Sequence, residues 1–397
     1  MKTEMDLKRS LKKSRLTFNS EFLVTMTSTC TFVIHTNTPM KTNFIFYSIL
    51  LSCCLVFNNT LSQNADRDFK YPNIILLIGD GNGLSQISAG NYVMGNQTAF
   101  DRFEFVGLIK VHADEVSILT DSAAAGTAIA CGKKTKSGML GMDAEKNELT
   151  SILEILKGKG YQTGLIATST IVHATPAAFY AKVEARSEYE LIASQLMSSS
   201  VDFFVGGGEK YFIEREDGKN LIKEFKQFEF VDNLDDFRSS QSEKIGYLTH
   251  ENNPPSLLEG RTPTLGESLS VLLEKFDSNK PFFAMVEGSQ IDWAGHDNDI
   301  EFLISEFKEF NQAIDISLDF AENNPSTLVI ATADHETGGL SVNNGNLENN
   351  TIIDAWGTGG HTATFVPVFS FGYDAIEFSG LYENTEIFHK LKNIVSH

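Results

Sequence analysis

Cysteine is scarce in this sequence, with four residues in a chain of 397, and their positions limit what they can do. Three of them, Cys30, Cys53 and Cys54, lie in the N-terminal segment that we expect to be removed on export. The remaining Cys131 cannot form an intrachain disulfide by itself, so stability must come from the core, with bound metals as a second source. Cys131 ends an alanine-rich run that favours a helix, where a cysteine is usually a small buried residue.

Basic residues are also in short supply. The chain has 32 Lys and Arg against 52 Asp and Glu, which gives a formal net charge of -20 at pH 7. This balance argues against a nucleic-acid-binding protein, because binding to a phosphate backbone depends on positive charge. A small anionic substrate is not excluded, since bound cations can reverse the charge of a site locally.

Long apolar runs are missing as well. The run at residues 44–57 covers about fourteen residues, too few for a comfortable membrane span. It follows the basic start Met40-Lys41 and precedes a polar zone at residues 58–63, a pattern typical of a secretory signal. Residues 1–39 are either a genuine extension or the product of an overcalled start codon. We therefore predict that residues 1–62 are an N-terminal extension and signal peptide, with the signal starting at Met40.

The expected destination follows from this signal. We expect the protein to be exported to the periplasm or the extracellular space, with no integral membrane span in the mature chain. A lipid anchor through Cys53 is the alternative. Residues 63–397 are then predicted to form one folded domain, and 42% hydrophobic residues are enough for a substantial core.

From residue 71 onward, short apolar runs alternate with amphipathic stretches. The apolar runs predict buried strands at Asn73–Ile78, Gly164–Ala167, Phe282–Val286 and Thr327–Ala331. The amphipathic stretches predict helices at Leu149–Lys157, Ser187–Ser198, Leu265–Phe276 and Glu301–Phe320. This alternation predicts an α/β fold, a three-layer α/β/α sandwich with a large, mostly parallel central sheet flanked by helices. Residues 341–351 read as a loop or small insertion, and residues 217–260 are the least patterned region.

Side chains that bind metals follow each of the predicted strands. Because ligands collect at the carboxyl ends of strands in open α/β sheets, we expect these side chains to converge on one site. They are Asp80, His173, Thr175, Glu287, Asp292, His296, Asp334 and His335. Mixed imidazole and carboxylate ligands suit zinc, whereas an all-oxygen set such as Asp80, Thr175 and Glu287 suits magnesium. A single aspartate at a strand end is more often a turn former or helix cap, but several such groups in one chain favour a site.

Two further residues lie in loops or at a helix start. His361 lies in the glycine-rich sequence Gly357-Thr-Gly-Gly-His361, whose backbone can fold closely around a bound group. Ser122 begins the alanine-rich run, where free backbone N–H groups and the helix dipole favour an anion. A hydroxyl there can attack a phosphoryl group if a metal lowers its pKa. An ordinary N-cap serine is the competing interpretation.

Taken together and in this order, the motifs resemble those of the alkaline phosphatases from residue 80 to residue 361. They are Gly-Asp80-Gly, Thr-Asp-Ser122-Ala-Ala-Ala-Gly-Thr, His-Ala-Thr175-Pro, Glu287-Gly-Ser-Gln-Ile-Asp292-Trp-Ala-Gly-His296, Ala-Asp334-His335-Glu-Thr-Gly-Gly and Gly-Gly-His361-Thr. The resemblance implies hydrolysis of small phosphate monoesters at alkaline pH, with release of inorganic phosphate and an alcohol. It also implies that residues 63–397 are the catalytic domain and that the protein is a homodimer.

The resemblance also assigns roles to the residues. Ser122 resembles the nucleophile that becomes phosphoserine, and Arg186 resembles the arginine that binds the phosphate. The expected cofactors are two Zn2+ and one Mg2+. The implied zinc ligands are Asp292, His296 and His361 for the first ion and Asp80, Asp334 and His335 for the second. The implied magnesium ligands are Asp80, Thr175 and Glu287, with His173 and Trp293 beside the magnesium and substrate sites, at positions where family members vary.

Three rival functions remain open from the residues alone. A phosphodiesterase or a sulfatase can be built on the same kind of sheet and metals, although an unmodified serine nucleophile argues against a sulfatase. A catalytically silent metal-binding protein would keep the ligands without the reaction. A phosphate-capturing protein would bind its ligand without needing Ser122, so replacing this residue with alanine separates binding from catalysis.

Overall fold

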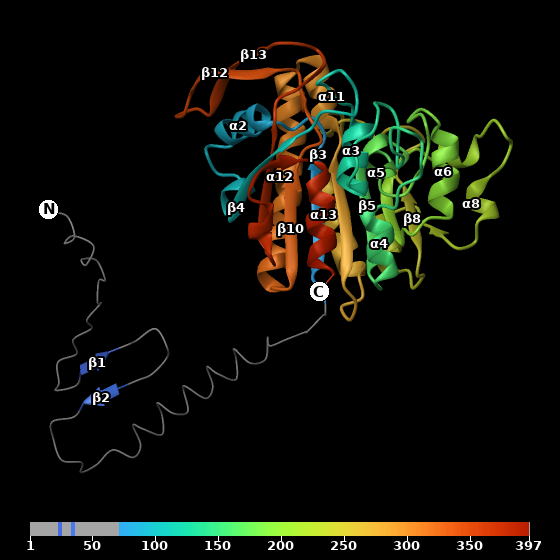
Figure 1. Cartoon of the computed structure of the whole chain (residues 1–397), viewed down its shortest axis with the longest axis horizontal. Helices are drawn as coiled ribbons and strands as arrows, with labels where there is room; N and C mark the ends of the chain where they lie inside the picture. The colour runs from blue at the N-terminus through green and yellow to red at the C-terminus, as the bar shows by residue number, and fades with distance from the viewer. Residues whose placement is uncertain (1–22, 26–32, 36–70, 397) are drawn as a thin grey trace. The chain divides into compact units, whose positions relative to one another are not determined.

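The computed structural model describes residues 23–25, 33–35 and 71–396 of the chain (Figure 1). The chain divides into two compact units, residues 1–67 and 68–397. In the first unit, strand β1 (Leu23–Thr25) pairs antiparallel with β2 (Val33–His35). The expected signal sequence at residues 40–62 lies outside the described residues, so the predicted boundary after residue 62 stays a prediction.

The second unit is built on one large sheet. Its strands are β3 (Asn73–Gly79), β4 (Phe105–Lys110), β5 (Gln162–Thr170), β6 (Phe203–Gly207), β7 (Glu229–Phe230), β8 (Ile245–Leu248), β9 (Phe282–Gly288), β10 (Thr327–Thr332), β15 (Val366–Gly372) and β16 (Gly380–Glu383). Within the described chain these ten strands lie in the order β16-β4-β15-β10-β3-β9-β5-β6-β8-β7. β15 runs antiparallel to both its neighbours, and the other pairings in this sheet are parallel. The predicted mostly parallel sheet is confirmed.

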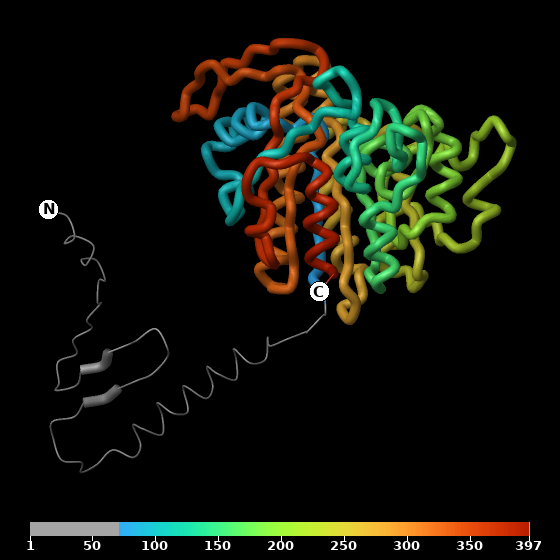
Figure 2. Tube along the Cα trace, viewed as in Figure 1, coloured from blue at the N-terminus to red at the C-terminus, as the bar shows by residue number. Residues whose placement is uncertain are grey.

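Helices cover both faces of this sheet, as Figures 1 and 2 show. Successive side chains of a strand point to opposite faces, so Leu76 of β3 packs into one core and its neighbour Leu77 into the other. The first core is covered by α3 (Ser122–Cys131), α4 (Ile152–Gly158), α5 (Ala174–Ala177), α6 (Tyr189–Met197), α7 (Lys210–Ile213), α8 (Leu221–Glu224) and α13 (Thr385–Ile394). The second core is covered by α2 (Leu84–Val93), α9 (Leu234–Ser239), α10 (Leu265–Lys275), α11 (Gln290–Asp297) and α12 (Ile300–Asn323). The predicted three-layer sandwich is therefore confirmed.

Short elements complete the domain. Single 3-10 turns occur at η1 (Ala99–Arg102), η2 (Leu257–Glu259) and η3 (Ala375–Phe378). Residues 341–351, expected to be a loop or a small insertion, form most of a hairpin of β12 (Leu340–Asn346) and β13 (Thr351–Trp356). A second small pair joins β11 (Glu336–Thr337) to β14 (His361–Thr362). None of the described helices is both long and apolar enough to cross a membrane.

The parallel strands β3, β9 and β10 end at the same edge of the sheet. Thr332 at the end of β10 pairs with Ile78 of β3, and Gly79 at the end of β3 pairs with Gly288 of β9. The carboxyl ends of these three central strands are therefore level with one another. Because β15 is antiparallel, its first residues lie at this same edge. They follow shortly after β14, the strand that contains His361. Residues far apart in the sequence are thus brought to one place.

Candidate active site

Three groups of candidate metal ligands occur among the described residues. In each group the possible ligand atoms lie within 4.8 Å of one another. We call them the first cluster (Asp292, His296 and His361), the second cluster (Asp80, Asp334 and His335) and the third cluster (Asp80, His173 and Glu287). The first two bring together the residues that the resemblance assigned to two zinc ions, and the third contains two of the three expected magnesium ligands.

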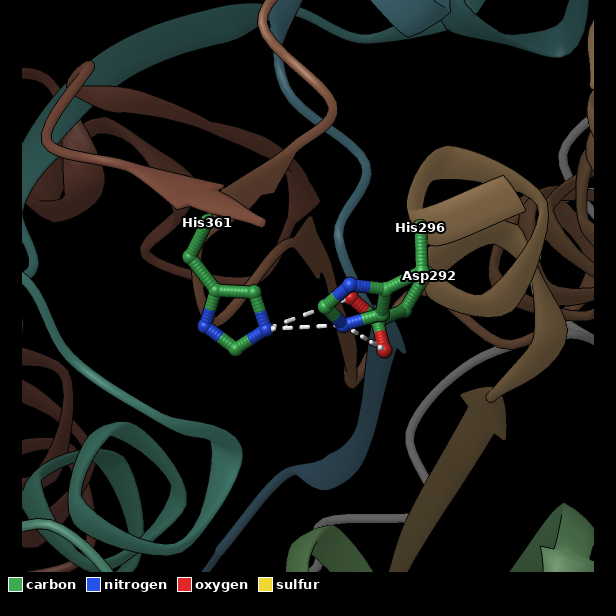
Figure 3. A group of neighbouring side chains, drawn as sticks. All are labelled: Asp292, His296 and His361. Carbon is green, nitrogen blue, oxygen red and sulfur yellow. Dashed lines mark hydrogen bonds and ion pairs between the residues drawn. The ribbon is translucent and has the colours of Figure 1, made fainter. Parts of the chain in front are cut away.

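In the first cluster, the two imidazole rings point toward each other by their Nε2 atoms, and the Asp292 carboxylate lies beside them (Figure 3). Nδ1 of His296 lies 2.8 Å from the carbonyl of Gly359, and Nδ1 of His361 lies 2.8 Å from that of Thr120. A carbonyl only accepts, so both Nδ1 atoms carry a proton and donate it. The two Nε2 atoms lie 3.2 Å apart, and each is within 3.5 Å of an Asp292 oxygen. Backbone carbonyls that fix the tautomer in this way are typical of metal-binding histidines.

The pKa values of the two histidines in the first cluster fit a positive charge between their rings. The hydrogen bond that His296 donates to the Asp292 carboxylate raises the pKa of His296 to about 9. Burial lowers the pKa of His361. His296 therefore keeps its Nε2 proton, which lies between the Asp292 carboxylate and Nε2 of His361. A metal cation bound by these three residues would take the place of this proton.

The second cluster is fully buried and includes the candidate nucleophile. Nε2 of His335 lies 3.4 Å from Asp80 Oδ1, 3.2 Å from Asp334 Oδ2 and 3.3 Å from the Ser122 hydroxyl. Both carboxylate oxygens of Asp80, together with Asp334 Oδ2, find no hydrogen-bond partner among the described residues. Burial and the nearby Asp334 raise the pKa of Asp80 well above its usual value. Unpaired buried carboxylates are costly, so this donor set fits a bound cation.

The third cluster lies on the other side of Asp80. Burial raises the pKa of Glu287 to about 7, and Glu287 Oε1 and the Thr175 hydroxyl have no hydrogen-bond partner in the described chain. These oxygens fit magnesium, which prefers oxygen ligands. The structure also brings in the imidazole of His173, so the expected all-oxygen set has a nitrogen close by.

Ser122 is placed at the start of α3 by its neighbour Asp121. The Asp121 carboxylate caps the helix by accepting from the Ala124 N–H at 3.0 Å. It also accepts from Nη1 of Arg186 at 3.1 Å, which holds this guanidinium beside the nucleophile. Burial acts to raise the pKa of Asp121, but these hydrogen bonds and the positive charge lower it overall, so the carboxylate stays ionised. A serine, an arginine and the free N–H groups of a helix terminus therefore face the same space.

His173 and Trp293 lie next to this arginine. Nη2 of Arg186 is 3.3 Å from Nε2 of His173, and the Trp293 ring meets the His173 ring edge-on at 6.3 Å. Burial, with the charge of Arg186, lowers the pKa of His173 to about 3, so this ring is neutral. All the residues predicted from the sequence are thus located at one edge of the sheet, while their individual roles stay predictions.

Sequence reasoning missed two residues that organise the site. Asp121 directly precedes Ser122, and an aspartate before an alanine-rich helix is itself an N-cap signal that could have found it. Thr337 lies two residues after His335, and its hydroxyl donates to Asp292 and contacts His335 Nδ1 at 3.1 Å. Thr337 lies inside the motif Ala-Asp334-His335-Glu-Thr-Gly-Gly, but the contact of its hydroxyl with Asp292, 45 residues away in the chain, is made only by the fold.

Phosphoryl transfer is the chemistry that this edge of the sheet fits. A hydroxyl at a helix N-terminus lies against a buried cluster of candidate ligands, and the adjacent Asp121 holds a guanidinium fork that can bind two oxygens of a phosphate. Sheet, nucleophile and ligand sets together define the class as metal-dependent hydrolases of phosphate esters.

Comparison with known proteins narrows this class to one family. The family profile described as alkaline phosphatase matches residues 71–354, and the chain belongs to this family. Alkaline phosphatase 3 of Bacillus subtilis is 34% identical over 433 aligned positions, which cover 86% of this chain and 93% of that protein. The chain is an enzyme that hydrolyses phosphate monoesters.

Solved structures agree with this assignment. Alkaline phosphatase from the Antarctic bacterium TAB5 is 40% identical, with a TM-score of 0.77, over 82% of this chain and 98% of that one. Two variants of the TAB5 enzyme, 38% and 39% identical to this chain, were solved with magnesium bound in a site termed M3. Metal sites therefore occur in this family, and the three clusters are the candidate metal sites of this chain.

Proposed function

We propose that this enzyme works at alkaline pH through a covalent phosphoserine intermediate on Ser122. The observation that carries the proposal is the position of the Ser122 hydroxyl, 3.3 Å from His335 Nε2 in a cluster where both Asp80 oxygens and Asp334 Oδ2 have no hydrogen-bond partner among the described residues. A serine that served only as a helix cap would not need this environment. The cap itself is supplied by Asp121, which leaves the Ser122 hydroxyl free to react.

The metal ligands form part of the same proposal. The first and second clusters would each hold a zinc ion, because imidazole and carboxylate together are zinc ligands. Asp80, Thr175 and Glu287 would hold magnesium, because both Asp80 oxygens, the Thr175 hydroxyl and Glu287 Oε1 are buried with no hydrogen-bond partner in the described structure. Bound at these places, the ions would stabilise negative charge on oxygen and lower the pKa of hydroxyl groups.

In the first half of the reaction, Ser122 Oγ attacks phosphorus and the bond from phosphorus to the substrate alcohol breaks. The serine proton is lost, and the departing alcohol oxygen gains one. Arg186, held by Asp121, binds two phosphoryl oxygens through its planar fork and keeps the group in line for attack.

In the second half, a water molecule attacks the phosphoserine from the side that the alcohol left. The bond from phosphorus to Ser122 Oγ breaks, inorganic phosphate leaves and the serine regains its proton. Two in-line displacements give net retention of configuration at phosphorus. Positioning and charge stabilisation supply most of the rate in reactions of this kind.

Export and assembly complete the proposal. The basic start, apolar run and polar zone at residues 40–63 support export to the periplasm or the extracellular space, with a lipid anchor at Cys53 as the alternative. The resemblance to the family supports a homodimer and a small phosphate monoester as substrate.

The experiment that tests the reaction uses 4-nitrophenyl phosphate at alkaline pH. We expect release of phosphate by protein loaded with zinc and magnesium, loss of activity after chelation and recovery when the metals are restored. The Ser122→Ala variant should bind the same metals and show a large loss of turnover. Metal-loaded protein that keeps most of its turnover without the Ser122 hydroxyl would contradict the proposed nucleophile.

A further inference from the structure

Thr337 lies between the first and second clusters and is fully buried on β11. Its hydroxyl contacts a ligand of each cluster: it donates to Asp292 Oδ1 and lies 3.1 Å from Nδ1 of His335. A hydroxyl has one proton, and an ionised carboxylate can only accept. With that proton given to Asp292, the Thr337 oxygen must accept from the Nδ1–H of His335.

This pair of hydrogen bonds has a consequence for both clusters. The proton on His335 Nδ1 leaves Nε2 with a free lone pair, which faces Asp80, Asp334 and the Ser122 hydroxyl. The bond to Asp292 Oδ1 restrains the rotation of the Asp292 carboxylate, which faces the two imidazoles of the first cluster. One hydroxyl therefore orients a ligand in each cluster.

The position of Thr337 is itself tightly fixed. Its N–H donates to the carbonyl of Gly81 at 3.3 Å, and its carbonyl accepts from Nε2 of Gln86 at 2.7 Å. Two glycines from separate motifs make room for its side chain. A Cβ at Gly81 would lie 2.9 Å from the Thr337 hydroxyl oxygen, and a Cβ at Gly295 would lie 3.0 Å from Thr337 Cβ. The backbone is packed against this threonine with no space for a displaced hydroxyl.

We propose that Thr337 is a positioning residue that couples the two zinc clusters, holding His335 in the Nδ1–H tautomer while it orients Asp292. The inference rests on the proposed function, because it takes both clusters to be zinc sites. Groups that orient metal ligands in this way contribute about 10- to 100-fold to metal affinity. Because the Thr337 hydroxyl contacts Asp292 in one cluster and His335 in the other, we expect its effect to reach each ion through that ligand.

The test compares three variants. Thr337→Val has nearly the same shape but neither donates nor accepts, and Thr337→Ser keeps the hydroxyl. The matched control is Thr163→Val, at the amino end of β5. Thr163 is also fully buried, and its hydroxyl donates to the Ser200 carbonyl at 2.7 Å, accepts from the Asp202 N–H at 3.1 Å and lies 3.3 Å from Asp202 Oδ2.

The measurement is zinc affinity of the metal-free full-length protein, obtained by competition with a chromophoric chelator and without any substrate. We expect Thr337→Val to bind both zinc ions about 10- to 100-fold more weakly. Thr337→Ser and Thr163→Val should bind them as the wild type does, even where Thr163→Val lowers the melting temperature.

Thr337→Val with unchanged affinity, or with only one ion affected, would overturn the coupling. An equal loss in Thr163→Val would assign the effect to general destabilisation, and an equal loss in Thr337→Ser would show that the hydroxyl is not responsible. Failure of the proposed function is distinguishable from these results, because the wild-type protein would then fail to bind zinc at either cluster.

Discussion

At the scale of single residues, the site depends on side chains that fix the state of their neighbours. Asp121 caps α3 with one oxygen and binds Arg186 with the other, so the helix that carries Ser122 and the guanidinium are held by one carboxylate. Arg186 in turn lies against His173 and helps to keep that ring neutral. A phosphate group arriving beside Ser122 meets positive charge that is already in place.

Replacing Arg186 with lysine tests this arrangement. An ammonium keeps the charge but cannot bind two phosphate oxygens through a planar fork. Because a hydrogen bond to a charged group contributes about 1.5–3 kcal/mol, we expect Arg186→Lys to lower kcat/KM by roughly 10- to 100-fold. The matched control is Arg238→Lys, an arginine on α9 whose partners are Glu274 and Asp235. Equal kcat/KM for Arg186→Lys and the wild type would contradict the proposed clamp.

Single residues also show which parts of the site could be predicted from the sequence. Asp80, Asp334 and His361 were predictable, because each belongs to a motif that directly follows a buried strand or fills a glycine-rich loop. Thr337 lies in the same motif as Asp334, but its contact with Asp292 was not predictable, since it depends on the packing of α11 against β11. The nearness of His173 to Asp80 likewise depends on where α5 lies in the folded chain.

At the scale of elements, buried strands were easier to predict than edge strands. β3, β5, β9 and β10 are covered on both faces, so they read as continuous apolar runs. β4 was not singled out, although all its residues except Lys110 are apolar or glycine. The start of α4 was placed early, at residue 149, because the capping box of Ser151 and Glu154 sets the first turn at Ile152.

The hairpin of β12 and β13 is an insertion near the site that contributes none of the candidate site residues. β12 is rich in asparagine and largely exposed, β13 alternates between exposed and half-buried side chains, and the candidate ligand His361 lies beyond both on β14. Backbone hydrogen bonds from the Gly357 N–H to the carbonyls of Gly338 and Gly339 close the base of the insertion.

The hairpin can therefore be shortened. Val342 and Asp354 are directly opposite each other, so residues 343–353 can be replaced by an Asn-Gly turn. We expect this variant to keep the zinc affinity and the turnover of the wild type, because the base of the insertion stays closed. Loss of zinc binding in a folded, shortened protein would show that the hairpin helps to form the clusters.

At the scale of the whole molecule, the site gathers negative charge in an already acidic protein. The chain has a formal net charge of -20, and Asp80, Glu287, Asp292 and Asp334 are all buried at one edge of the sheet. Bound cations would offset this repulsion, so metals are expected to stabilise the fold as well as to serve catalysis.

The pH dependence of stability tests this expectation at Glu287. Burial raises its pKa from 4.5 to about 7. A carboxyl group that binds its proton more tightly when folded stabilises the fold at low pH, and this contribution is lost as pH rises from about 4.5 to about 7. In metal-free protein, Glu287→Gln should therefore be more stable than the wild type by about 3 kcal/mol at pH 8, and by only about 1 kcal/mol at pH 5.

Denaturant unfolding at the two pH values measures this difference. Saturating magnesium is the control, and it should favour the wild type, because an amide is a weaker magnesium ligand than a carboxylate. The same difference in unfolding free energy at pH 5 and pH 8 would contradict the raised pKa.

The most direct test of the central claim is to trap the covalent intermediate. Metal-loaded enzyme turning over a phosphate monoester is quenched in acid, digested with trypsin and analysed by mass spectrometry for the peptide at residues 111–133. We predict one added phosphoryl group, placed on Ser122 by fragmentation and missing from the Ser122→Ala variant. An active enzyme whose peptide carries no phosphoryl group, or carries it on another residue, would contradict the phosphoserine mechanism.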